Sequence, residues 1–219
     1  MAIHGIDVLS YEAPSQPPWK LYANICPLFT ELRKKETAPY KMQMLFLEHL
    51  LFEHADSIQI YTDCSKVEEG VGYAYVTGES IKSAKIRKDL IIFTAELYAI
   101  LEALEFIDTN LNRNFTIITV SLSSLQAVER PYSDHPLVSK IQSWLISLSS
   151  RQKTVSLCWT PSHVRLAGNE RADHEARLAI TQNNFEYVLA VTHRDYYSRI
   201  KRNIKKRWSD EWEAMHDRE

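Results

Sequence analysis

The strongest constraint on the fold is the order of hydrophobic patterns in the middle of the chain. Three stretches rich in β-branched and aromatic residues, 57–63, 71–78 and 80–86, follow one another with only short breaks. Alternating apolar and polar side chains favour half-buried strands, and the Gly78-Glu79 pair favours a tight turn between the second and third stretch. The segment therefore predicts three antiparallel strands that form a meander.

After the meander, strand and helix patterns alternate. The stretch 94–108, TAELYAILEALEFID, repeats apolar residues at helical spacing, and Thr94 is its expected N-cap. The elements expected after it are a strand at 115–120, helices at 121–130 and 136–149, a strand at 154–160 and a helix at 168–180. This order predicts an α/β fold with a mixed five-stranded sheet, three antiparallel strands and then two parallel ones, and helices on both faces.

The segments on either side of this pattern have a different composition. Five of the eight prolines lie before residue 40, so residues 1–40 are predicted to be an extended arm. A short helix is expected at 40–55, with an apolar stripe that comprises Met44, Leu45, Leu47, Leu50 and Leu51. We therefore predict three parts, which are a proline-rich arm with a short helix at 1–55, the α/β domain at 56–180, and a basic helix with an acidic end at 181–219.

The cysteines and the net charge limit the class of protein. Cys26, Cys64 and Cys158 are odd in number and widely spaced in the sequence, which argues against a disulfide framework and a zinc site and favours a reducing compartment. The formal net charge of -2 gives no overall attraction to nucleic acid. Since neither a secretory signal nor a run of about 18 apolar residues is apparent, we expect an intracellular monomer, cytoplasmic or nuclear, that binds no membrane.

Three acidic residues stand at places where predicted elements meet. Asp63 closes the first strand, Glu96 lies in the first turn of the first long helix, and Asp173 lies in the last helix of the domain. This fold pattern can bring the three to one edge of the sheet, where their mutual repulsion favours a divalent cation, and hard oxygen ligands suit Mg²⁺ or Mn²⁺. Each acid alone is also typical of an ordinary role, as a turn residue, a partner of the helix dipole or a solvated helix position.

The sequence around these acids resembles a known family. The runs IYTDCSK, FTAELYAILEALEFI and CWTPSHVRLAGNERADHEA, all within 56–180, are similar to the type 1 ribonuclease H domain. The likeness is to the version at the end of non-LTR retrotransposon reverse transcriptases, and the arm and the IKKRWSDEW run also resemble sequences beside that domain. The resemblance implies hydrolysis of the RNA strand of RNA–DNA hybrids by a pair of divalent metal ions, Mg²⁺ or Mn²⁺.

The resemblance also assigns roles to individual residues. The family uses four carboxylates, and three of them fall on Asp63, Glu96 and Asp173, as metal ligands in the catalytic site. Its mobile histidine, which assists proton transfer and product release, falls on His163, and an imidazole that titrates near neutrality suits this role. The alternative for His163 is an ordinary solvated loop residue.

The third carboxylate of the family pattern is missing from this chain. In the run ITVSLSSL its place falls on Val120, which offers no lone pair to a metal, and the neighbouring Ser121 is a poor substitute for a carboxylate. No acid occurs between Asp108 and Glu129, so a shifted alignment does not restore the ligand. We therefore expect hydrolysis to be weak or lost. Alternatively, Val120 is simply a residue of a central strand that is buried on both faces.

Two smaller departures accompany the valine. Cys64 replaces the glycine that usually follows the first aspartate of the family, and it places a side chain beside the metal site. Arg165 stands where glycine is common in the loop SHVRLAGN. The arginine either contacts a phosphate or only stiffens the loop.

Candidate nucleic-acid contacts come from the domain and from the basic tail. Small polar side chains near the substrate groove suit recognition of backbone shape and 2′-hydroxyls. The segment 194–208 interleaves basic and aromatic residues, which suits phosphate contact and base stacking and is also typical of a solvated helix paired with the acidic end. The candidates are Ser65, Ser121, Ser123, Arg165, Asn169, Lys205 and Arg207.

Three functions are compatible with these patterns. The first is a ribonuclease H-type hydrolase with weakened activity, and the second is an inactive fold that still binds a hybrid or another nucleic acid. The third is a retroelement-derived domain that binds protein or has a structural role. The roughly 55 residues before the domain are too few for a reverse transcriptase, so we expect none in this chain, which favours the second and third functions.

Overall fold

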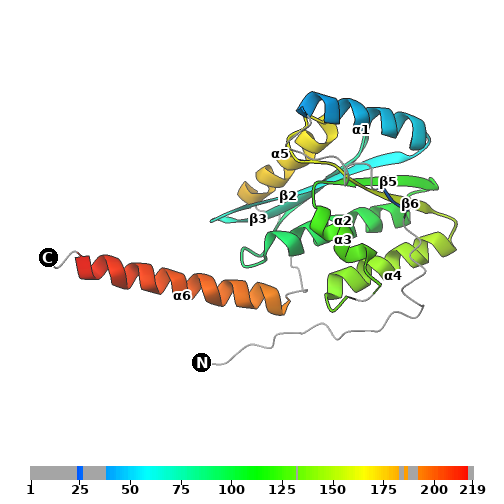
Figure 1. Ribbon diagram of the computed structural model, residues 1–219. Coiled ribbons are helices and arrows are strands. Elements are labelled where there is room, and N and C mark those ends of the chain that lie inside the picture. The colour runs from blue at the N-terminus through cyan, green and yellow to red at the C-terminus, as the bar shows by residue number, and fades with distance from the viewer. Residues whose placement is uncertain (1–23, 27–37, 132, 183–184, 187–191, 217–219) are drawn as a thin grey trace.

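The centre of the protein is one mixed β-sheet. The computed structural model describes residues 24–26, 38–131, 133–182, 185–186 and 192–216, so most of the predicted arm lies outside the described residues. Six strands lie in the order β1-β6-β5-β2-β3-β4 (Figure 1). They are β1 (Asn24–Cys26), β2 (Ile58–Val67), β3 (Gly70–Val76), β4 (Ile81–Ile86), β5 (Asn114–Thr119) and β6 (Thr154–Trp159). The β2-β3-β4 meander is antiparallel, whereas β2, β5, β6 and β1 pair in parallel.

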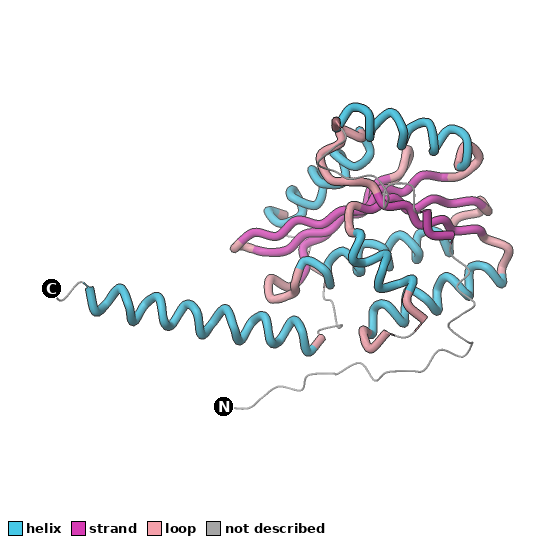
Figure 2. Tube along the Cα trace, in the orientation of Figure 1, coloured by secondary structure: helices cyan, strands magenta, loops and turns pink. Residues whose placement is uncertain are grey.

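Helices cover both faces of this sheet (Figure 2). One face carries α1 (Pro39–Glu53) and α5 (Ala167–Thr181), and the other carries α2 (Ile92–Thr109), α3 (Leu122–Glu129) and α4 (Pro136–Ser150). The predicted α/β class, the meander followed by parallel strands, and the helices on both faces are confirmed. None of the helices in the described ranges has the length and apolar character needed to cross a membrane.

The sheet has one strand more than the five that the sequence predicts. The three residues of β1 pair with β6, and Cys26 lies directly opposite Cys158. A three-residue segment carries no alternating pattern, so only its pairing with a distant strand makes it extended. The extended-arm prediction is therefore corrected for 24–26, which belong to the sheet.

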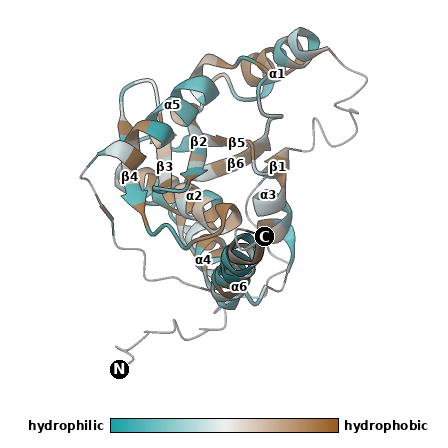
Figure 3. Cartoon of the chain, turned by 90° about the vertical axis from the view of Figure 1, so that its left-hand side faces the viewer, coloured by the Kyte–Doolittle hydropathy of each residue, from teal (hydrophilic) through white to brown (hydrophobic). Residues whose placement is uncertain are grey.

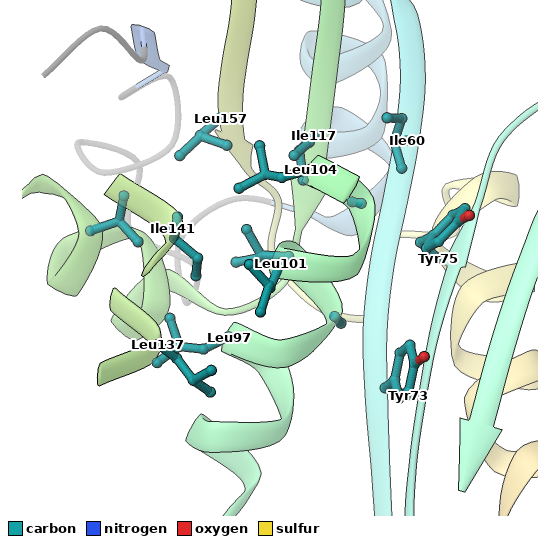
Figure 4. Packing of buried hydrophobic residues seen from close by; sticks show 14 of the residues in the cluster. Ile60, Tyr73, Tyr75, Leu97, Leu101, Leu104, Ile117, Leu137, Ile141 and Leu157 are labelled. Carbon is teal, nitrogen blue, oxygen red and sulfur yellow. The ribbon is translucent and has the colours of Figure 1, made fainter. Parts of the chain in front are cut away.

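Two apolar clusters fix the helices to the sheet. The larger cluster fills the space between the sheet and α2 and α4, where Leu97, Leu101 and Leu104 meet Ile117 and Leu157 (Figure 4). Full burial of such a side chain contributes about 1.5–3 kcal/mol. This cluster therefore holds α2, and with it the residues of its first turn, in a fixed position.

The smaller cluster lies under α1, and it corrects the stripe predicted for that helix. Met42, Phe46 and Leu50, each four residues after the last, pack against the sheet, whereas the predicted stripe members Met44 and Leu47 are exposed. Apolar residues occur on several sides of this helix, so periodicity alone does not identify the packed face. The predicted Leu51 is exposed as well.

The start of α2 is held by an acid from α6 (His193–His216), about one hundred residues away. Asp195 is 1% exposed, and its Oδ1 accepts hydrogen bonds from the Ile91 amide at 2.8 Å and the Thr94 hydroxyl at 3.0 Å. Its Oδ2 accepts from the amide and hydroxyl of Thr192 at 2.9 and 2.6 Å. The prediction of Thr94 as N-cap is wrong, because α2 begins two residues earlier and the Thr94 hydroxyl serves Asp195. This contact fixes the turn that carries Glu96.

Beyond its first turn, α6 projects away from the sheet. Its residues are exposed from 199 to 215, and its surface is largely hydrophilic (Figure 3). The basic segment and much of the acidic end form one continuous helix. Side chains on this helix are therefore available to a partner rather than to the core.

Candidate active site

The carboxyl end of β5 opens into a small cavity that collects polar side chains. The cavity has a volume of about 260 Å³, and its lining includes Asp63, Asp173, Val120, His163 and Asn169. Asp63 comes from β2, Asp173 from α5, and His163 from the connection between β6 and α5. Three separate segments of the sequence thus meet here, and two of the three predicted acids, Asp63 and Asp173, line the cavity.

Glu96 lies behind Asp63 on the α2 side of the sheet. Both carboxyl groups are buried, each in a residue that is 7% exposed, and the Cys64 thiol lies against the Glu96 carboxylate. Glu96 Oε2 is buried and accepts no hydrogen bond from the described residues. An orphaned buried carboxylate oxygen is uncommon, and a water molecule or a cation would satisfy it.

Burial changes the protonation of these acids. It raises the pKa of Asp63 to about 7, and the nearby Asp173 adds repulsion, while the Cys64 amide donates to Asp63 Oδ1 at 2.8 Å and opposes the change. Burial also raises the pKa of Glu96 to about 8, with a further contribution from the Asp63 charge. A cation between these groups would favour their ionised forms, since opposite charge stabilises a carboxylate.

Asp173 has a different environment, because it is paired with a cation on its own helix. Arg177 Nε donates to Asp173 Oδ1 at 3.0 Å, and its Nη2 lies 2.7 Å from Oδ2. The arginine side chain is largely exposed, so the pair contributes little to stability, but it places positive charge at the cavity. The same charge lowers the pKa of Asp63, against the effect of burial.

Val120 lies one residue beyond the end of β5 and not inside it. The valine is half-buried and lines the same cavity as Asp63 and Asp173. The Trp159 indole donates to the Val120 carbonyl oxygen at 3.0 Å, which holds the backbone at this point. The alternative of an ordinary residue in a strand buried on both faces is therefore wrong, and an apolar side chain faces a polar cavity.

A comparison with protein-family models decides the family. The RNase H model matches residues 55–181, which is more than half of the chain. The chain belongs to the RNase H family. This membership supports a ribonuclease that acts on RNA–DNA hybrids, with nucleic acid as substrate and divalent metal as the family's general cofactor. A search of curated proteins finds no match.

The RNase H site fits a hard divalent cation in its donor chemistry but not in the number of its ligands. Asp63, Glu96 and Asp173 offer carboxylate oxygens, and the orphaned Glu96 Oε2 suits a cation. The Val120 side chain offers no oxygen. In the described part of the chain, the three carboxylates do not all lie within 4.8 Å of one another, and Asp173 is paired with Arg177.

The backbone of the loop before α5 shows why glycine is common at position 165 in the RNase H pattern. His163 and Arg165 are exposed and have φ angles of 66° and 59°, in the left-handed region that glycine adopts most easily. Glycine is therefore the natural choice at 165, and arginine is held there at some cost in strain. The Gln43 side chain donates to the Arg165 carbonyl oxygen at 2.8 Å, so α1 helps to fix the loop.

The candidate nucleic-acid contacts fall into two groups in the RNase H fold. Ser65 and Asn169 line the cavity, and the buried Asn169 Oδ1 accepts no hydrogen bond within the described residues. Ser121 follows Val120, and its hydroxyl lies 2.7 Å from that of Ser124 and 3.4 Å from that of Ser123. Arg165 is exposed on the loop, whereas Lys205 and Arg207 lie on the projecting α6 and outside the cavity lining.

Sequence reasoning missed two cations of the site. Lys66 and Arg177 both line the cavity, and Lys66 also donates to the Leu90 carbonyl oxygen. Arg177 follows Asp173 by four residues on a helix, and this spacing is a signal for an ion pair that the sequence contained. Lys66 lies three residues after Asp63 on β2, and no sequence pattern distinguishes it from a solvated lysine.

Proposed function

We propose that this chain is a ribonuclease H domain of the non-LTR retrotransposon type whose hydrolysis of hybrid RNA is strongly impaired by Val120. The observation that carries the proposal is the position of this side chain. Val120 lines the same cavity as Asp63 and Asp173, at the point where the family pattern has a carboxylate. Mutation of groups that only hydrogen-bond to the metal ligands already changes metal affinity or activity by about 10–100-fold. Loss of a direct ligand should therefore cost more than that.

Asp63, Glu96 and Asp173 are the proposed ligands of Mg²⁺ or Mn²⁺. A bound ion of this kind supplies an activated water and stabilises a leaving phosphate oxygen. His163 is exposed, lines the cavity and is proposed to assist proton transfer to the leaving oxygen and product release. With Val120 in place of a fourth carboxylate and the Arg177 guanidinium at the cavity, we expect weaker metal binding than four carboxylates would give.

Nucleic-acid contacts are proposed at the cavity and on α6. Around the cavity, small polar groups and the exposed Arg165 suit the sugar and phosphate atoms of a hybrid. On α6, Lys205 and Arg207 are exposed, although Arg207 Nη2 lies 3.9 Å from Glu211 Oε1, and both are proposed to contact phosphates, which would extend the bound surface away from the sheet. The polar residues proposed at the cavity are Ser65, Ser121, Ser123 and Asn169.

A catalytically inactive domain that binds nucleic acid or protein is the second candidate. It is favoured by the Asp173–Arg177 pair, because a guanidinium already supplies the positive charge that a metal ion would bring. For both candidates we propose the same division into a 1–55 arm with a short helix, the 56–180 ribonuclease H-like domain and a 181–219 basic helix with an acidic end. The family match over 55–181 supports this division.

Cleavage of a labelled RNA–DNA hybrid in Mg²⁺ and in Mn²⁺ tests the proposal. We expect Val120→Asp to cleave at least about 100-fold faster than the natural chain, whereas the isosteric neutral control Val120→Asn should gain little. Asp63→Asn added to Val120→Asp should abolish the gained activity, which shows that it arises at this cavity. Robust cleavage by the natural chain that Asp63→Asn abolishes would refute impairment by Val120.

A binding assay on the same hybrid separates the two candidates. If Val120→Asp stays inactive while the natural chain binds the hybrid with a steep dependence on salt, the second candidate holds for nucleic acid. Replacing Lys205 and Arg207 by alanine should then reduce the salt slope by about one unit per lost phosphate contact. Absence of binding at low salt would exclude a nucleic-acid role.

A further inference from the structure

Two cysteines and a histidine meet at the β1 edge of the sheet, although they are far apart in the sequence. Cys26 on β1, Cys158 on β6 and His49 on α1 place their ligand atoms within 4.8 Å of one another. Cys26 and Cys158 are both thiols and lie opposite each other in the parallel β1–β6 pair. The wide sequence spacing that argues against a zinc site is thus overcome by the fold.

A second histidine lies beside this group of three. His54, at the end of α1, places its Nε2 3.7 Å from Cys158 Sγ, and its ring lies against the His49 ring with centroids 5.0 Å apart. Cys26 Sγ lies 2.9 Å from His49 Nε2. Zinc–sulfur bonds of about 2.3 Å and zinc–nitrogen bonds of about 2.0–2.1 Å give tetrahedral ligand separations of about 3.3–3.8 Å. The Cys158–His54 separation lies in this range, and the Cys26–His49 separation is shorter.

We propose that Cys26, His49, His54 and Cys158 form a structural Zn²⁺ site. Two thiolates and two imidazoles are the donor set that favours tetrahedral zinc over the hard cations suited to carboxylates. The four residues come from β1, α1 and β6, so one ion would join three elements. The site is separate from the carboxylate cavity and needs none of its residues.

The surroundings allow the ion both to enter and to be held. A cavity of about 570 Å³ is lined by Cys26, His49 and His54, and it also contacts the amino ends of β5 and β6 at Asn114 and Thr154. Cys158 is 0% exposed and closes the site from the side of the smaller apolar cluster. The carboxylate cavity lies beyond the opposite end of β5, so the two cavities are distinct.

A metal at this site would stabilise the edge of the sheet. β1 has only three residues to pair with β6, and a metal bond from Cys26 to Cys158 would fix this short strand at the edge of the sheet.

Zinc content and metal uptake of the full chain test the site. Protein purified under reducing conditions without chelator should contain one zinc per chain, and Co²⁺ in place of zinc should give the charge-transfer absorption of cobalt–thiolate bonds. Zinc at about 100-fold excess over its dissociation constant should raise the Tm by about 5–11 °C, and a chelator should reverse this shift. These measurements require no catalytic activity.

Matched variants locate the ion. Cys26→Ser and His49→Gln change partly exposed residues, so both variants should fold. Each variant should lose the cobalt–thiolate absorption or bind zinc at least tenfold more weakly than the natural chain. The cysteine control Cys64→Ser and the exposed histidine control His174→Gln should keep the full zinc content. Absence of zinc uptake by the natural chain, unchanged zinc in Cys26→Ser, or a Cys26–Cys158 disulfide under the same conditions would each overturn the proposal.

Discussion

The buried carboxylate of Asp195 provides a quantitative test of how the fold positions the first turn of α2. This side chain accepts hydrogen bonds from the Ile91 amide, the Thr94 hydroxyl, and the amide and hydroxyl of Thr192. Asp195→Ala removes the acceptor for all four donors at once. The donors then have to turn elsewhere, admit water or remain unpaired.

The cost follows from which donors can adapt. The two threonine hydroxyls can rotate toward other acceptors, whereas the Thr192 amide is buried and the Ile91 amide is partly buried. An unsatisfied buried amide costs about 1–3 kcal/mol, and the partly exposed one costs less, so we expect Asp195→Ala to lower the free energy of unfolding by about 3 kcal/mol. Asp195→Asn keeps one acceptor oxygen but turns an NH₂ group toward Thr192, and we expect a loss of about 1–2 kcal/mol.

Urea denaturation of the full chain measures both losses. The matched control is Asp210→Ala, on the exposed part of α6, which should stay within about 0.5 kcal/mol of the parent. A loss of about 3 kcal/mol corresponds to a fall in Tm of about 6–12 °C. If Asp195→Ala loses less than about 1 kcal/mol, or if Asp210→Ala loses as much, then the contact does not hold α2 and the reasoning is refuted.

Two further predictions concern residues away from the carboxylate cavity. Burial lowers the pKa of His135 below its usual 6.5, so the unfolded chain binds more protons and the free energy of unfolding should fall as the pH drops below about 6.5. His135→Gln should weaken the dependence of the free energy of unfolding on pH, measured by urea titrations at several pH values. An unchanged dependence would contradict the assignment of this effect to His135. A methyl group on Gly72 would overlap the Ala176 carbonyl oxygen of α5, so Gly72→Ala should cost about 1–3 kcal/mol. Gly78→Ala, which meets nothing within 4 Å, should be neutral, and equal losses for both variants would contradict the packing argument.

The order of strands and helices is predictable because local patterns dominate it. β2 to β6 and α2 to α5 all occur close to their predicted positions, since each carries enough residues to show a period of two or 3.6. Asp63 and Asp173 line one cavity although neither ends its element, since β2 continues to Val67 and α5 to Thr181. The prediction that Asp63 closes the first strand is therefore wrong. That these acids bind metal stays a prediction.

The contacts that sequence reasoning missed join residues far apart in the chain. Asp195 serves a helix start 104 residues earlier, where local rules offer only Thr94 as a cap. Cys26 becomes the neighbour of Cys158 only when β1 adds to the sheet, and three residues are too few to predict a strand. β5 ends at Thr119, one residue earlier than predicted, and this difference places Val120 at the cavity and not in the buried strand.

The fold does not depend on the chemistry of the side chain at position 120. Two side chains anchor β5, since Ile117 packs into the larger apolar cluster and Ile118 into the smaller one, on opposite faces of the sheet. The Trp159 indole binds the backbone oxygen of Val120, which any residue offers. A carboxylate here would instead add a negative charge beside Asp63, whose pKa is already raised to about 7 by burial and by Asp173. An acid at position 120 would therefore repel Asp63 in the metal-free chain, and valine avoids this repulsion.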